Sequence, residues 1–238
     1  VQSNHTIRAV FVINQYTITA SAGLHGSINP SGAIGVAYGA NQAFAITPAA
    51  GYSVDSVVVD GVKTDSTTSY TFTNVQSNHT IRAVFIINQY TITASAGPNG
   101  SINPSGSIGV SYSGTQAFAV TPVTGYSVDS LIVDGIKTDS TTSYTFTNVQ
   151  SNHTIRAVFK INQYTITASA GPNGSINPSG SIDVTYGGTQ AFAVTPVAGY
   201  SIDSLIVDGI NTDSTTSYTF TNVQSNHTIR AVFIINQY

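Results

Sequence analysis

A 74-residue repeat constrains the fold of this chain more than any other feature of its sequence. The segment QYTITASAG begins at positions 15, 89 and 163, and VQSNHTIRAVF begins at positions 1, 75, 149 and 223. A repeat of this length is one small folding unit that neighbouring units help to stabilise. The predicted domains are the closing strand of a preceding repeat at 1–15, three repeats at 16–89, 90–163 and 164–237, and the first residue of a further repeat at 238.

The sequence of each repeat favours strands. Glu and Met are absent while Thr, Val, Ile, Tyr and Phe abound, and β-branched and aromatic residues prefer strands. Apolar and polar residues alternate at 90–96, 143–149 and 153–159, as in half-buried strands. The segments GPNG and INPSG predict turns. We expect an all-β fold with six or seven short strands per repeat, either a β-sandwich or β-grasp-like.

Two further patterns predict local structure. The Asp134–Gly135 pair predicts a type I′ hairpin turn that pairs Val133 with Ile136. Several positions exchange one apolar residue for another between repeats, which predicts that most of them are buried. These positions are Val57, Leu131 and Leu205; Val58, Ile132 and Ile206; Val62, Ile136 and Ile210; and Ile46, Val120 and Val194.

The junctions between repeats lack a flexible linker. In TIRAVFKINQYTITASA no Gly or Pro separates the closing strand of one repeat from the opening strand of the next, whereas flexible linkers are rich in Gly and Ser. We therefore expect repeats stacked head to tail as a rigid rod. Strand donation into a neighbouring chain is an open alternative. The expected junction residues are Ile13, Tyr16, Ile87, Tyr90, Ile161 and Tyr164.

The sequence predicts no enzymatic activity. There is no Cys, and His79, His153 and His227 each stand alone in an NHT segment, which suits a strand start better than a metal site of three or four ligands. Asp60 is explained by its turn, and pairing through that turn places Asp55 and Asp65 on opposite faces. We expect no catalytic, metal or cofactor-binding residues and no cofactor.

Charge and hydropathy restrict the partners. The net charge is −3, whereas nucleic-acid binding needs a basic face, and the apolar runs are too short for a membrane helix. We expect neither nucleic-acid binding nor membrane insertion within this segment. Glycans are candidate partners through N-x-S/T sequons. The candidate attachment sites are Asn4, Asn78, Asn152, Asn226, Asn99 and Asn173.

The pattern YTITASAGPNGSINPSG…QAFAVTP..GYSVDSLIVDG…SYTFTNV…HTIRAVF resembles the divergent internalin B-repeat family of bacterial extracellular proteins, over all three repeats. The resemblance implies a secreted or surface-anchored chain of tandem small β domains without enzymatic activity. Better-known relatives have a β-grasp fold with one short helix, whereas this sequence shows no helical periodicity.

We expect a structural protein that forms an extracellular filament or a cell-surface stalk. Its expected partner is itself, through adjacent repeats and other copies of the chain, and its expected location is extracellular or at the cell surface. The alternative is an adhesin segment or carbohydrate-binding module that recognises a glycan or host protein. That alternative needs exposed aromatic patches, and each repeat supplies four Tyr residues.

Overall fold

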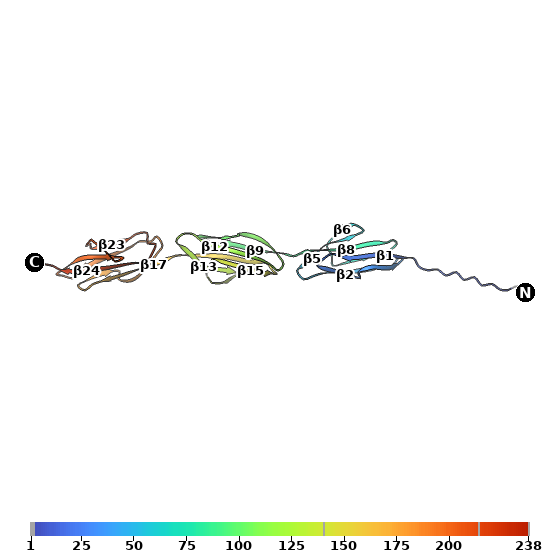
Figure 1. The fold of residues 1–238 in the computed structure, drawn as a ribbon, viewed down its shortest axis with the longest axis horizontal. Coiled ribbons are helices and arrows are strands. Elements are labelled where there is room, and N and C mark those ends of the chain that lie inside the picture. The colour runs from blue at the N-terminus through green and yellow to red at the C-terminus, as the bar shows by residue number, and fades with distance from the viewer. Residues whose placement is uncertain (1–2, 140, 214, 238) are drawn as a thin grey trace. The chain divides into compact units, whose positions relative to one another are not determined.

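The computed structural model describes residues 3–139, 141–213 and 215–237. Residue 238, expected to begin a further repeat, and residues 1 and 2, expected in a preceding closing strand, lie outside them. Within the described residues each repeat forms eight strands, which Figure 1 shows in part by label. Those of the first repeat are β1 (Gln15–Ala22), β2 (Gly26–Asn29), β3 (Gly32–Ala37), β4 (Gln42–Pro48), β5 (Tyr52–Val59), β6 (Val62–Thr64), β7 (Ser69–Phe72) and β8 (His79–Ile87).

The second and third repeats have the same order of strands. Those of the second are β9 (Gln89–Ala96), β10 (Gly100–Asn103), β11 (Gly106–Ser111), β12 (Gly114–Pro122), β13 (Tyr126–Val133), β14 (Ile136–Lys137), β15 (Ser143–Val149) and β16 (His153–Ile161). Those of the third are β17 (Gln163–Ala170), β18 (Gly174–Asn177), β19 (Gly180–Thr185), β20 (Gln190–Pro196), β21 (Tyr200–Val207), β22 (Ile210–Thr212), β23 (Ser217–Phe220) and β24 (His227–Ile235).

Two sheets make up each repeat. In the first, the larger sheet has the order β3-β1-β8-β5-β6 and the smaller one the order β2-β4-β7. The closing strand β8 is the central strand of the larger sheet, parallel to β1 and antiparallel to β5. β1 opens the repeat and β8 closes it, so the first and last strands of the repeat are neighbours in the larger sheet.

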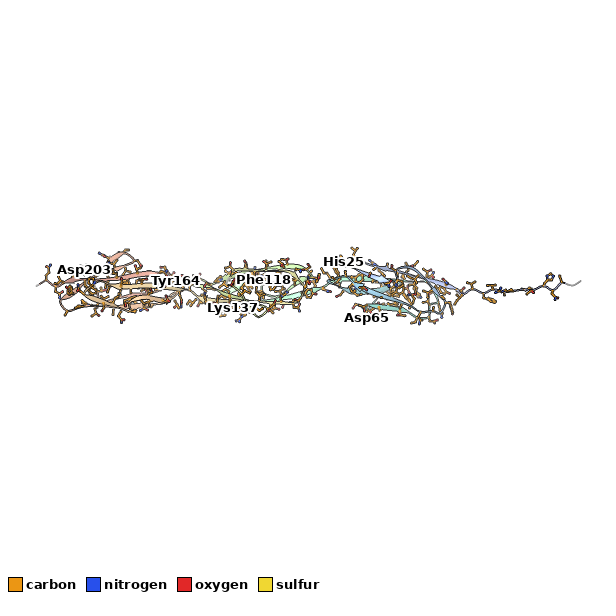
Figure 2. The ribbon with its side chains drawn as sticks, turned by 90° about the horizontal axis from the view of Figure 1, so that it is seen from below. His25, Asp65, Phe118, Lys137, Tyr164 and Asp203 are labelled. Carbon is orange, nitrogen blue, oxygen red and sulfur yellow. The ribbon has the colours of Figure 1, made fainter. Side chains whose placement is uncertain are left out.

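The two sheets of a repeat pack against each other around one apolar core. In the first repeat that core joins Ile18 and Ile81 of the larger sheet to Ile28, Phe44 and Phe72 of the smaller. Phe118, the second repeat's equivalent of Phe44, lies within that repeat (Figure 2). The prediction of tandem all-β domains is therefore confirmed, with a β-sandwich as the architecture. The described residues contain no helix, in contrast to the better-known relatives.

The predicted number of strands was too low. The segment GSIN, interpreted as part of two successive turns, forms the short strands β2, β10 and β18. Its one apolar residue explains the difference, because Ile28, Ile102 and Ile176 are buried in the cores of their repeats. Two turns therefore flank a strand of only four residues, which is too short to show a clear alternation.

The predicted hairpin turn is confirmed. Val133 pairs with Ile136, and both Asp134 and Gly135 have positive φ, at 50° and 80°. The preceding strand contains an irregularity that the sequence did not predict, a register shift between Val128 and Ser130. This bulge shifts the alternation by one residue, so that Val128 and Leu131, three positions apart, are both buried opposite Phe159 and Ala157.

Most of the exchanged apolar positions are buried or half-buried, as predicted. The positions of Val57 and Ile46 and their counterparts are buried, and that of Val58 is half-buried. The position of Val62 is the exception, since Val62, Ile136 and Ile210 are 67%, 70% and 70% exposed. These residues lie on the edge strands β6, β14 and β22, which have a neighbouring strand on only one side.

The chain divides into two compact units. One takes in residues 1–91, 109–116 and 146–152, and the other takes in 92–108, 117–145 and 153–238. We consider each unit by itself. Residues 3–14, ahead of β1, form no strand and are exposed throughout.

Candidate functional site

A single asparagine connects β8 to β9 in the first compact unit. The Asn88 N–H donates to the carbonyl of Gly51, and its carbonyl accepts from the Tyr112 N–H, both at 2.8 Å. Its side-chain Oδ1 accepts from Ser53 Oγ at 2.5 Å. Both backbone polar groups of the connecting residue are thus satisfied by turn residues, Gly51 just before β5 and Tyr112 just after β11, whereas a flexible linker would leave them to water.

The second compact unit contains the same arrangement one repeat later. The Asn162 N–H donates to the Gly125 carbonyl at 2.9 Å, and the Asn162 carbonyl accepts from the Tyr186 N–H at 2.8 Å. Two further asparagines make one of these two hydrogen bonds each. The Asn14 carbonyl accepts from the Tyr38 N–H, and the Asn236 N–H donates to the Gly199 carbonyl.

A tyrosine ring lies on Gly51, whose carbonyl contacts Asn88, and another lies on Gly125, whose carbonyl contacts Asn162. A Cβ added to Gly51 would lie 2.0 Å from Tyr112 Cδ1, and one added to Gly125 would lie 2.3 Å from Tyr186 Cδ1. A Cβ on Gly199 would meet no atom within 4 Å. The contact therefore needs a glycine at this position, and all three glycines also have positive φ.

The residues expected at the junctions lie beside this arrangement. Tyr16, Tyr90 and Tyr164 are half-buried, and their rings lie 6.3–6.5 Å from those of Tyr38, Tyr112 and Tyr186. Ile87 is half-buried, whereas Ile13 and Ile161 are 58% and 37% exposed. Figure 2 labels Tyr164.

Sequence reasoning missed the residues that make the hydrogen bonds and the ring contact. They are the connecting asparagine, the glycine of each GYS segment and the second tyrosine. Part of their signal was available, because all three residues stand at the same place in every copy, and the positions directly before the glycine and the tyrosine vary. The missing information was the fold, since Gly51 and Tyr112 are distant in sequence.

A second repeated cluster joins the β5–β6 turn to the start of β8. Asp60 Oδ2 lies 2.7 Å from His79 Nδ1, and its Oδ1 accepts from the Thr80 N–H at 2.7 Å. The His79 ring packs on Phe72, with centroids 4.8 Å apart. The histidine thus stands at a strand start, as predicted. Asp60 forms the β5–β6 turn and also connects that turn by hydrogen bonds to β8, the central strand of the larger sheet.

The cluster has the connectivity of a Ser–His–Asp triad, which the sequence analysis did not bring together. Ser77 Oγ lies 3.3 Å from His79 Nε2, and Ser225 Oγ lies 3.4 Å from His227 Nε2. Nucleophile and base in such triads usually lie about 2.6–3.2 Å apart. With serines on exposed turns and separations beyond that range, the arrangement supports a structural tie better than nucleophilic catalysis.

The aspartates of these clusters make the repeats sensitive to acid. Partial burial by itself raises the pKa of Asp60, but hydrogen bonds from Thr80 and His79 outweigh it and hold the pKa below its usual value. Asp134 and Asp208 have lowered pKa values for the same reasons. A lowered folded-state pKa contributes stability above the unfolded-state pKa, about 3.9, and loses it as pH falls through the folded value.

We therefore expect the stability of the repeats to fall below about pH 4, and the triple variant D60N/D134N/D208N to flatten that fall. Asn tolerates the positive φ of the turn and still accepts a hydrogen bond, so the pH dependence should change more than the fold. Urea unfolding at a series of pH values measures it, with Asp65→Asn, an exposed carboxylate, as the control. An unchanged pH profile in the triple variant would contradict the assignment. Hydrogen bonds from Lys63 and Lys137 also lower the pKa values of Asp55 and Asp129, so the triple variant should keep part of the pH dependence.

The sequon asparagines have structural contacts of their own. Oδ1 of Asn78, Asn152 and Asn226 accepts from the backbone N–H of Thr17, Thr91 and Thr165 at 2.8–2.9 Å. Asn99 and Asn173 have positive φ of 71° and 75° in turns, and Asn4 is exposed. All six side chains lie at the surface, and glycan attachment there stays a prediction.

Other candidate sites are weak in the described part of the chain. Across residues 3–139, 141–213 and 215–237, no group of three or more His, Cys, Asp or Glu side chains could hold a metal ion. Asp55 instead accepts from Lys63 Nζ at 3.1 Å and from the buried Ser56 at 3.0 Å. The same described ranges hold no helix of the length and hydrophobicity needed to cross a membrane.

The chain belongs to the divergent InlB B-repeat domain family, whose profile matches residues 16–89, 90–163 and 164–237. No curated protein matches it. The family and the observed sandwiches agree that this is a tandem array of B-repeat-like β domains.

Several solved structures resemble the chain at low identity. The Bacillus anthracis TIE protein is 10% identical with a TM-score of 0.39, and the match covers 94% of this chain and 51% of that one. The pilus adhesin SpaC from Lactobacillus rhamnosus GG is 9% identical with a TM-score of 0.21, covering 94% and 44%. The I9–I11 tandem from titin is 8% identical with a TM-score of 0.15, covering 93% and 97%. The chain thus spans about half the length of the TIE structure, and at these scores the likenesses carry no functional argument.

Proposed function

We propose that this chain is a non-enzymatic structural array, a segment of an extracellular filament or cell-surface stalk in which successive repeats are held stiffly. The observation that carries the proposal is the connecting asparagine, whose N–H and carbonyl are both hydrogen-bonded, as Asn88 is to Gly51 and Tyr112. A stiff connection transmits force and keeps distance, and these are the tasks of a stalk or filament.

The family supports the extracellular setting. The B-repeat family match spans all three repeats. The adhesin alternative needs an exposed aromatic patch in every repeat. Among described residues, Tyr side chains are half-buried except Tyr38, which is 50% exposed.

Distance measurements between spin labels test the stiffness of the connection. The chain has no native Cys, so V62C and I136C place labels at equivalent exposed positions of neighbouring repeats. We expect a narrow distance distribution that broadens when Gly-Gly-Ser is inserted after Asn88. The same insertion after Ser66, in the turn following β6, is the matched control and should leave the width unchanged. A broad distribution in the chain without an insertion would contradict the proposal.

A further inference from the structure

The first and last strands of each repeat are parallel neighbours, and the chain enters and leaves the repeat at their opposite ends. In the first repeat β1 begins at Gln15 and β8 ends at Ile87, and Ile18 pairs with His79 in parallel register. The second and third repeats pair β9 with β16 and β17 with β24 in the same way. Tension in the backbone therefore pulls the two strands of each pair in opposite directions along their own axes.

The register gives the direction of that pull relative to the strands. Because Ile18 lies opposite His79, Gln15 and Ile87 are about eleven residues apart along the strands, or about 36 Å at 3.3 Å per residue. Across the strands they are separated by only about 4.8 Å, the spacing of neighbouring strands. The line between the two ends therefore runs almost along the strands, and the hydrogen bonds between β1 and β8 are loaded in shear.

The parallel ladder between β1 and β8 extends beyond the five paired residues at both ends. The Gly23 N–H, one residue past the end of β1, donates to the Ala83 carbonyl at 2.9 Å. The Thr17 N–H, ahead of the paired residues, donates to the side-chain Oδ1 of Asn78 at 2.8 Å. Alternate N–H groups of a strand point to the same side, so Thr17 and Gly23 belong to one ladder. The Asn78 side chain thus supplies the acceptor at the point where β8 has not yet begun.

Both end contacts recur in the other two repeats, each at 2.9 Å. They join Thr91 to Asn152, Thr165 to Asn226, Gly97 to Ala157 and Gly171 to Ala231. On the core side of the first pair, Ala20, Ile81 and Ala83 are 4%, 1% and 0% exposed. Core atoms therefore cover this side of the ladder, and water can replace its hydrogen bonds only from the outer face.

We propose that each parallel pair is a load-bearing clamp, made in the first repeat by residues 17–23 and 78–83, and that Asn78, Asn152 and Asn226 are part of it. Forced unfolding depends on the barrier to unfolding, and that barrier depends on the direction of the pull. Bonds loaded in shear have to break together, whereas bonds pulled sideways break one after another. Each repeat should therefore resist tension along the chain far better than tension across its sheet.

The inference goes beyond the proposed stiff array, because it concerns the strength of each repeat and not the connection between repeats. It also gives the asparagines of the NHT segments a function that needs no glycan. The spin-label distances test only the connection, so the array can be stiff without clamps, and the clamps can hold in an array that is flexible.

Optical tweezers test the clamp in the full chain, with handles at two introduced cysteines, since the chain has no Cys of its own. Q15C/I86C pulls the first repeat from the start of β1 and the end of β8, along the strands. L24C/I86C pulls from the turn after β1 instead. Because Ala22 pairs with Ala83, its two handles lie at the same end of the pair, and the pull is across the strands. All three handle positions are exposed.

We expect the rupture force of Q15C/I86C to be several times that of L24C/I86C at the same pulling rate. The gain in length should be about 200 Å in both, from about 60–70 residues released at about 3.5 Å each, which shows that the same repeat unfolds. Equal rupture forces in the two directions would overturn the clamp.

Asn78→Ala separates the clamp from general stability when it is added to each handle pair. Loss of the bond to Thr17 should lower the force along the strands, because this bond carries load together with the rest of the ladder. It should leave the force across the strands unchanged, because Asn78 lies at the end of the pair that opens last. Gln76→Ala, at a nearby exposed position, is the matched control and should change neither force. If Asn78→Ala lowered both forces equally, the assignment of this asparagine to the clamp would be wrong.

Discussion

Replacing Phe44 by Ala is expected to destabilise the first repeat selectively. Phe44 is 1% exposed and contacts the Phe72 ring edge to face, with centroids 6.0 Å apart. Removing a buried Phe side chain costs about 4 kcal/mol through lost burial and the cavity left behind. At about 0.05–0.15 kcal/mol per residue, a repeat of this size has a stability of roughly 4–11 kcal/mol, so the loss would remove between about a third and all of it.

Hydrogen exchange resolved by peptide measures this effect in the right repeat. The first repeat differs enough in sequence from the others for its peptides to be assigned, and protection there should fall sharply in F44A. Leu24→Ala is the matched control, because Leu24 belongs to the same repeat and is 83% exposed. Its effect should stay within about 0.5 kcal/mol. If F44A and Leu24→Ala lost the same hydrogen-exchange protection, Phe44 would not belong to the core of the first repeat.

The sequence predicted the elements that depend on neighbouring residues. Alternation at 90–96 and 153–159 gave strands, and Asp134–Gly135 gave the hairpin turn, because side-chain period and turn geometry are local properties. The bulge beside Asp129 was not predicted. A pattern of alternating apolar and polar residues does not indicate an extra residue in a strand. The bulge is visible only in the pairing of β13 with β16.

Burial was harder to predict at the sheet edges. Leu131 and Ile136 both exchange with other apolar residues between repeats, yet one is fully buried and the other 70% exposed. Their difference lies in topology: Leu131 is on β13, between two strands, and Ile136 is on the edge strand β14. Strand order depends on contacts that no local pattern contains.

The junctions show the same limit for the candidate site. The absence of a Gly- or Ser-rich linker predicted a tight connection, and the hydrophobic residues around it were the natural candidates. The contacts observed are instead the backbone of Asn88 and Asn162 and the packing of Tyr112 and Tyr186 on glycines. Every residue type except Pro has the same backbone N–H and carbonyl, so side-chain type does not show which residues make these hydrogen bonds. The sequence therefore predicted a tight junction but not the residues that form it.

Replacing Gly125 by Ala is expected to disrupt the junction in the second compact unit, and Gly199→Ala is its matched control. Both glycines have positive φ, at 84° and 88°, so both variants carry a backbone cost of about 1 kcal/mol. Only at Gly125 does the new methyl group also meet a ring, with Tyr186 Cδ1 at 2.3 Å. Because Cδ1 is close to the root of that side chain, the whole ring has to move.

The difference between the two variants therefore isolates the ring contact. We expect G125A to lose about 1–3 kcal/mol more than G199A in urea unfolding, the usual cost of overpacking. The Tyr186 N–H, which donates to the Asn162 carbonyl at 2.8 Å, should exchange faster in G125A and be unchanged in G199A. G51A should behave like G125A, since Tyr112 lies on Gly51 in the same way. If all three variants lost the same stability and left both tyrosine amides protected, the tyrosine–glycine contact would have no part in joining successive repeats.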